Sequence, residues 1–113
     1  MRKTLLLSRR YLCRSMLFYM PHILPFVPVA KQLLRSATSV CANINEAIYV
    51  NSKADFISKL HISLKETGES IYWLTLLKRT NLIDYDFEKL LSLAEEIKRM
   101  LIASLNTAKE NKQ

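Results

Sequence analysis

The chain has 113 residues, half of them hydrophobic, with a formal net charge of +7 and a single glycine. A chain of this length forms one domain at most and buries only about 60–70% of its unfolded surface, so self-association would stabilise it. A phosphate-binding loop needs several glycines for close backbone approach, and the composition therefore excludes that class of nucleotide-binding protein.

The net charge belongs to the N-terminal part of the chain. Seven basic residues precede the first acidic residue, Glu46, and the 68 residues from Glu46 onward carry ten basic and ten acidic side chains. A basic arm on a neutral body indicates a polyanionic partner. An amphipathic segment on an anionic membrane surface is the alternative. The candidate nucleic-acid contacts are Arg2, Lys3, Arg9, Arg10, Arg14 and Lys31.

The first 29 residues differ in composition from the rest. All three prolines lie within residues 21–28, and the apolar run over residues 16–30 is too short, and too often interrupted by proline, to span a bilayer. We therefore predict no transmembrane segment. Because Arg9 and Arg10 stop the leading apolar run, we also expect no export signal. A cytoplasmic protein with both Cys13 and Cys41 reduced is the corresponding expectation.

Residues 30–113 are predicted to form a helical core, because they contain no proline and only Gly68. The predicted helices cover about 29–49, 52–80 and 84–110. Ser52 is the expected N-cap of the middle helix, and Asp84 or a neighbour is expected to cap the last one.

Helical periodicity supports these assignments. The first and last predicted helices each carry one apolar stripe, as in a bundle. The middle helix has two stripes on different sides, and the second needs another neighbour, for which a second copy of the chain is the natural candidate. The stripe of the first predicted helix is Leu33, Leu34, Ala37, Val40, Cys41, Ile44 and Ile48. The core stripe of the middle helix is Phe56, Leu60, Leu64, Ile71 and Leu74. The stripe of the last helix is Phe87, Leu90, Ala94, Ile97, Leu101, Leu105 and Ala108. The predicted oligomer interface is Ile62, Trp73 and Leu76.

Polar residues within the helices predict a structural network rather than catalysis. Arg35 is expected to pair with one or more of Glu46, Glu66 and Glu69, and Asn43 is a further candidate member. A bundle metal site would pair glutamates with Glu-x-x-His motifs. Neither His22 nor His61 falls at such a position, so we expect no metal, no cofactor and no enzymatic activity.

Several spaced motifs occur in one order: Lys31-Gln-Leu-Leu-Arg-Ser36, Ala42-Asn-Ile-Asn-Glu-Ala47, Ser52-Lys-Ala-Asp-Phe-Ile57 and Leu64-Lys-Glu-x-x-Glu-x-x-Tyr-Trp-Leu74. Over residues 31–108 the chain thereby resembles the small four-helix bundle family named for 23S rRNA intervening sequences. The resemblance implies an all-α, up-and-down four-helix bundle that assembles as a homopentamer. A related branch resembles the accessory protein of diversity-generating retroelements, which binds nucleic acid, and only membership of that branch would imply a reverse transcriptase partner.

The chain departs from the family pattern at Cys41, where glycine is usual, at Gly68, and throughout residues 1–29. We expect the first helix to be atypical or partly disordered, and a shifted reading frame or misassigned start is one hypothesis for this segment. Two function classes stay open. One is a non-catalytic, nucleic-acid-associated oligomeric bundle, and the other is a structural or protein-interaction module without nucleic-acid binding.

Overall fold

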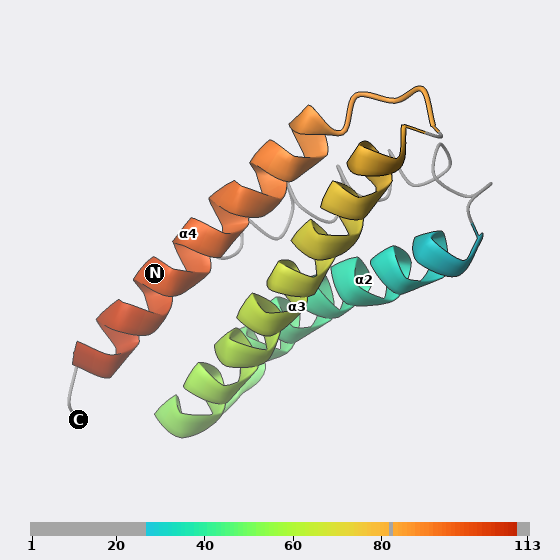
Figure 1. Ribbon diagram of the computed structural model, residues 1–113. Coiled ribbons are helices and arrows are strands. Elements are labelled where there is room, and N and C mark those ends of the chain that lie inside the picture. Colours follow the sequence, from blue (N-terminus) through green and yellow to red (C-terminus); the bar gives the residue numbers. More distant parts are fainter. Residues whose placement is uncertain (1–26, 82, 111–113) are drawn as a thin grey trace.

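The computed structural model describes residues 27–81 and 83–110, and these residues form three helices and no strand (Figure 1). Helix α2 covers Val27–Tyr49, α3 covers Lys53–Thr80 and α4 covers Glu88–Glu110. The all-α prediction is confirmed for this part of the chain. The predicted first helix lies in residues outside the described range, so the fourth member of the bundle stays a prediction.

Helix α2 begins at Val27, two residues before the predicted start at residue 29. Pro28 therefore lies in its first turn, where the missing N–H removes no intrahelical hydrogen bond and the fixed backbone angle already suits a helix. Pro28 is thus part of the first turn of α2 and does not separate the helix from the preceding segment.

Helix α3 has the predicted N-cap, Ser52, and ends at Thr80 with Asn81 as its C-cap. The Oγ of Ser52 accepts a hydrogen bond from the backbone N–H of Asp55 at 3.1 Å. At the other end, Asn81 adopts a left-handed conformation with φ of 53°, and its N–H donates to the carbonyl of Lys78. Asparagine tolerates this conformation better than most residues, which explains why the helix ends there.

Helix α4 begins at Glu88, four residues after the predicted start at residue 84. The carboxylate of Asp86 accepts a hydrogen bond from the N–H of Glu88 at 3.1 Å, so the capping contact comes from a neighbour of Asp84, as the prediction allowed. Phe87, between cap and helix, is buried and packs edge-on against Tyr85 with ring centroids 5.1 Å apart. The connection from α3 to α4 is therefore tied to the core by an aromatic side chain.

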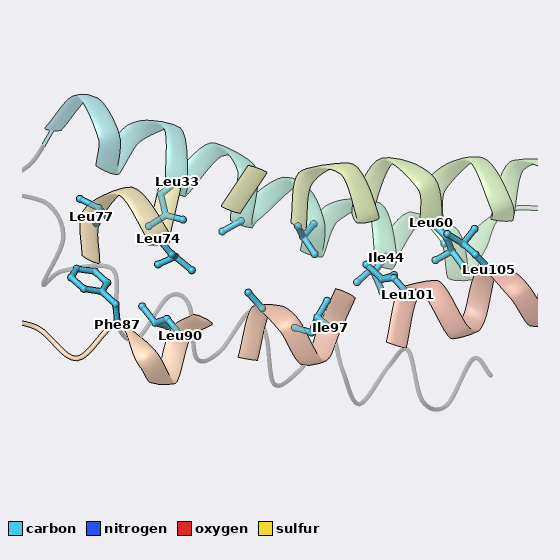
Figure 2. Close-up of a cluster of buried hydrophobic side chains, with 14 of the residues drawn as sticks. Leu33, Ile44, Leu60, Leu74, Leu77, Phe87, Leu90, Ile97, Leu101 and Leu105 are labelled. Carbon is cyan, nitrogen blue, oxygen red and sulfur yellow. The ribbon is translucent and has the colours of Figure 1, made fainter. Parts of the chain in front are cut away.

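The three helices run antiparallel to one another in chain order, and α3 contacts both α2 and α4 (Figure 1). Leucine and isoleucine side chains from all three helices meet between them along the length of the bundle (Figure 2). The apolar stripe predicted for α4 is buried in full. The largest fully buried apolar side chains are Leu33, Val40, Ile44, Leu60, Leu74, Leu90 and Leu101.

The buried face of α3 is more polar than predicted. Leu64 and Ile71 were expected in its core stripe, yet both are only half-buried. Ser63, Thr67 and Ser70 are buried instead. These small side chains recur at steps of three or four, so they lie on one face of α3. On this face the Oγ of Ser63 contacts α2 by donating a hydrogen bond to the carbonyl of Val40 at 3.1 Å.

Two further observations concern the predictions of reduced cysteines and of no transmembrane segment. Cys41 is disulfide-bonded, so the prediction of a reduced thiol at this position is wrong. Spacing along the sequence tests metal-ligand motifs, but it does not show which sulfur atoms the fold brings together. No helix in residues 27–81 or 83–110 is long and apolar enough to cross a membrane.

Candidate functional site

Four polar side chains form a cluster where α2 meets α3, which we call the Arg35 cluster: Arg35, Glu66, Glu69 and Trp73. The Nη1 of Arg35 donates to Glu66 Oε2 at 3.3 Å, and its Nη2 pairs with Glu69. The indole Nε1 of Trp73 donates to the same Glu69 oxygen at 3.2 Å. One guanidinium and one indole thereby satisfy two neighbouring carboxylates.

Helical spacing explains why these side chains meet. Glu66, Glu69 and Trp73 follow one another at steps of three and four along α3, so they lie on one line of the helix. Directly beneath this line, the hydroxyl oxygens of Ser36 and Ser70 lie 2.9 Å apart across the helix boundary. Small residues at that level bring α2 and α3 close enough for Arg35 to reach both glutamates.

The structure does not bring the other two predicted network members to this cluster. Asn43 donates from Nδ2 to the carbonyl of Ser39, one turn earlier in α2, at 2.9 Å. Glu46 pairs with Lys59 of α3 at 2.7 Å, near the α2–α3 turn. Both positions are more than two turns from Arg35 along α2, which is too far for a shared contact.

Chemically, the Arg35 cluster is suited to holding two helices in register. Its guanidinium and both carboxylates are engaged with one another, and every buried side-chain N or O atom among the described residues has a hydrogen-bond partner. Within the described part of the chain, no group of three or more His, Cys, Asp and Glu side chains could hold a metal ion. Paired charges of this kind fix helix register more reliably than they add stability.

Of the predicted interface residues, Trp73 belongs to the Arg35 cluster, and Ile62 and Leu76 lie on the same line of α3. Ile62 is 38% exposed, while Trp73 and Leu76 are half-buried. Trp73 also contacts Tyr72 in a T-shaped arrangement, with ring centroids 4.9 Å apart. An exposed isoleucine and two half-covered large side chains remain on this side of the subunit.

The structure places the predicted nucleic-acid contacts unevenly. Lys31 is exposed near the start of α2. The other five, Arg2, Lys3, Arg9, Arg10 and Arg14, lie outside the described residues. A set that the sequence reasoning missed follows the outer side of α3, where five exposed residues share a line that contains no acidic residue, although Glu69 flanks it one turn after Lys65: His61, Lys65, Gly68, Tyr72 and Arg79. Their spacing of three, four and seven residues is the sequence pattern that indicates a common line on a helix.

Comparisons with known proteins agree with this architecture. A solved structure from Bacteroides thetaiotaomicron, described as a protein of unknown function from the S23 ribosomal protein family, is similar at 34% sequence identity and a TM-score of 0.84. The similarity covers 93% of this chain and 97% of that one. No curated protein matches the chain significantly. The family model described as 23S rRNA-intervening sequence protein matches residues 27–103, and the chain belongs to that family.

Proposed function

We propose that this protein is a non-catalytic, oligomeric four-helix bundle protein that associates with nucleic acid. The observation that carries the proposal is the distribution of charge. Residues 1–26 contain five basic residues and no acidic one, whereas residues 27–110 contain eleven basic and ten acidic residues. The family description also refers to 23S rRNA.

The physical reason is that phosphate contacts add. Each lysine or arginine that neutralises a phosphate releases a condensed counterion, so affinity rises with the number of contacts and falls steeply with salt. Oligomerisation would place several copies of the basic segment on one assembly. Segments whose individual affinity for nucleic acid is low would then bind together. A pentamer, as the resemblance implies, would present 25 basic side chains from residues 1–26.

A second candidate function is a structural or protein-interaction module that does not bind nucleic acid directly. It is favoured by Ile62, Trp73 and Leu76, which leave partly exposed apolar surface on the flank of α3 that adjoins α2. A subunit of this size gains stability by covering such surface, and a second copy of the chain is the partner we propose.

The test is a salt titration of RNA binding to the full-length protein, measured by fluorescence anisotropy. The test variant replaces Arg2, Lys3, Arg9, Arg10 and Arg14 with Gln. The matched control removes the same number of charges elsewhere, by replacing Lys53, Lys98, Arg99, Lys109 and Lys112 with Gln.

We expect the wild-type protein to bind, with log K falling linearly against log salt by about 0.7 per contacted phosphate of single-stranded RNA. The test variant should show a shallower slope than the control. Absence of wild-type binding at 20 mM salt would refute nucleic-acid association and leave the interaction module. Equal losses in test and control variants would show that only net charge matters.

A further inference from the structure

The outer side of α3 carries a line of five exposed residues that we call the Tyr72 ridge. It consists of His61, Lys65, Gly68, Tyr72 and Arg79, all exposed. At about 100° per residue, these positions fall within an arc of about 60°, and they extend about 27 Å along the helix axis. None of them contributes to the core between α2, α3 and α4.

The acidic side chains of α3 lie off the Tyr72 ridge, and two of its five basic side chains lie on it. Its acidic residues are Asp55, Glu66 and Glu69; Asp55 lies in the first turn, and the two glutamates are held by Arg35. Lys65 and Arg79 lie on the Tyr72 ridge instead, seven residues before and after Tyr72. Each is therefore about 10 Å from Tyr72 along the axis, on either side of the exposed ring.

Tyr72 is an exposed aromatic residue with an ordered neighbour. Its side chain is 59% exposed, and it contacts Trp73, which in turn donates to Glu69 of the Arg35 cluster. A T-shaped contact can cover at most one face of the Tyr72 ring. The Arg35 cluster thus holds Trp73, Trp73 supports Tyr72, and more than half of the Tyr72 surface stays exposed.

No contact within the described part of the subunit requires glycine at position 68. A Cβ atom built at this position meets nothing within 4 Å, yet glycine inside a helix costs about 1 kcal/mol relative to alanine. Long side chains in helices lean toward the N-terminus, over the residue four positions earlier. For Tyr72 that residue is Gly68, so the ring borders a stretch of bare backbone.

We propose that the Tyr72 ridge binds single-stranded nucleic acid. An unpaired base stacks on the open face of Tyr72 in the space beside Gly68, and Lys65 and Arg79 contact the phosphates on either side. Aromatic stacking combined with basic side chains is the usual way in which proteins hold single strands without reading sequence. This inference rests on the proposed nucleic-acid association and adds a site on the folded body to the basic N-terminal segment.

The composition of the ridge favours nucleic acid over a second copy of the chain. Subunit contacts deplete lysine and charge at their centre and concentrate apolar side chains, although they also enrich tyrosine and arginine. Tyr72 is the one large side chain with apolar area on the ridge, and its neighbours in the line are a histidine, a lysine, an arginine and a glycine. The apolar candidates for subunit contact, Ile62 and Leu76, lie off this line toward α2.

The first experiment compares Tyr72→Leu with Tyr49→Leu, each in the full-length protein. Tyr49 is the matched control, because it is also exposed, at 76%, but lies at the end of α2 away from the ridge. The probe is a labelled 12-nucleotide oligouridine, with a 12-base-pair RNA duplex as the second ligand. We expect Tyr72→Leu to weaken single-strand binding about tenfold and to leave duplex binding within about twofold, since a paired base cannot stack on the ring.

A second experiment tests the rest of the ridge. The double variant Lys65→Gln with Arg79→Gln should reduce the salt slope by about 1.4, the value for two phosphates of a single strand. Arg99→Gln with Lys109→Gln on α4 removes the same charge and should change the slope far less. Gly68→Gln should weaken single-strand binding while the protein stays folded by circular dichroism, whereas Gly68→Ala adds only a methyl group and should bind nearly normally.

The outcomes separate this inference from the proposed function. If the wild-type protein binds the oligouridine but Tyr72→Leu binds it equally well, the ridge is not the site and nucleic-acid association stands. If the wild-type protein binds neither ligand, both fail. If Tyr72→Leu changes the sedimentation mass of the free protein, the ridge is a subunit contact and the inference is overturned.

Discussion

Arg35 serves two carboxylates that differ in their exposure to water. The Glu66 side chain is only 12% exposed, and Arg35 is the side chain that donates to it across the α2–α3 boundary. Glu69 is more exposed and also accepts from Trp73. Since a buried carboxylate without a donor costs more than an exposed one, the two halves of the cluster should respond differently to substitution.

We predict that Arg35→Gln lowers the free energy of unfolding by about 1–3 kcal/mol, because it leaves Glu66 without its charged partner. Glu69→Gln should cost less than about 1 kcal/mol, since Trp73 can still donate to the amide oxygen. Urea denaturation followed by circular dichroism measures both. The double variant Arg35→Gln with Glu66→Gln should recover part of the loss; equal losses for Arg35→Gln and Glu69→Gln would show that Glu66 does not depend on Arg35.

Gly68 gives a prediction with the opposite sign. Gly68→Ala should stabilise the protein by about 0.5–1 kcal/mol, because the added Cβ meets open space and alanine restricts the unfolded chain. The midpoint of thermal unfolding should then rise by about 2–8 °C. A lowered midpoint would mean that another part of the molecule or another subunit occupies the space beside Gly68.

At the level of the helices, α4 offers an internal comparison. Leu101 is buried in the core and Ile102, the next residue, is exposed on the outer side. Leu101→Ala should therefore destabilise the protein by about 2–5 kcal/mol through lost burial and a cavity. Ile102→Ala should change stability by about 1 kcal/mol or less in the same urea titration, and similar losses at both positions would indicate that Ile102 is covered in solution.

Helix α4 could be predicted almost completely from sequence because its buried face is apolar apart from Ser104. Helix α3 could not, since Ser63, Thr67 and Ser70 form much of its buried face and hydrophobic periodicity does not detect small polar residues. Their burial is possible because each hydroxyl finds an acceptor in the helices themselves. Leu64 and Ile71 were consequently assigned too deep in the core.

The candidate site was also only partly predictable. The pairing of Arg35 with glutamates of α3 follows from charges placed on facing helices, but the choice of partner depends on how the helices are aligned. That alignment brings Glu46 to Lys59 instead. The Tyr72 ridge contains no recognisable sequence motif, because its residues are separated along the chain and share a line only once they lie on one helix.

At the level of the whole molecule, α3 connects the described helices and also faces outward. It packs against α2 and α4, holds the Arg35 cluster on one flank and carries the Tyr72 ridge on its outer side. The basic N-terminal segment adds charge to a body that is nearly neutral. Because the proposed subunit contact and the Tyr72 ridge lie on different lines of α3, substitutions on this helix should separate assembly from binding.

For assembly, we predict that Ile62→Lys or Leu76→Lys lowers the sedimentation mass of the free protein, because a charge in an apolar contact is left without a partner. Trp73 is less suitable for this test, since it also supports the Arg35 cluster. Thr107→Lys, at an exposed position of α4, is the matched control and should leave the mass unchanged. Unaltered mass in both interface variants would place the subunit contact elsewhere.

The most direct test of the account is the mass of the full-length protein in solution, measured by analytical ultracentrifugation with and without single-stranded RNA at low salt. We predict a mass that is a multiple of the 13.1 kDa subunit, five subunits if the family resemblance holds, and a further increase when RNA is added. A particle of 13.1 kDa whose mass does not change with RNA would contradict both the assembly and the nucleic-acid association proposed for this protein.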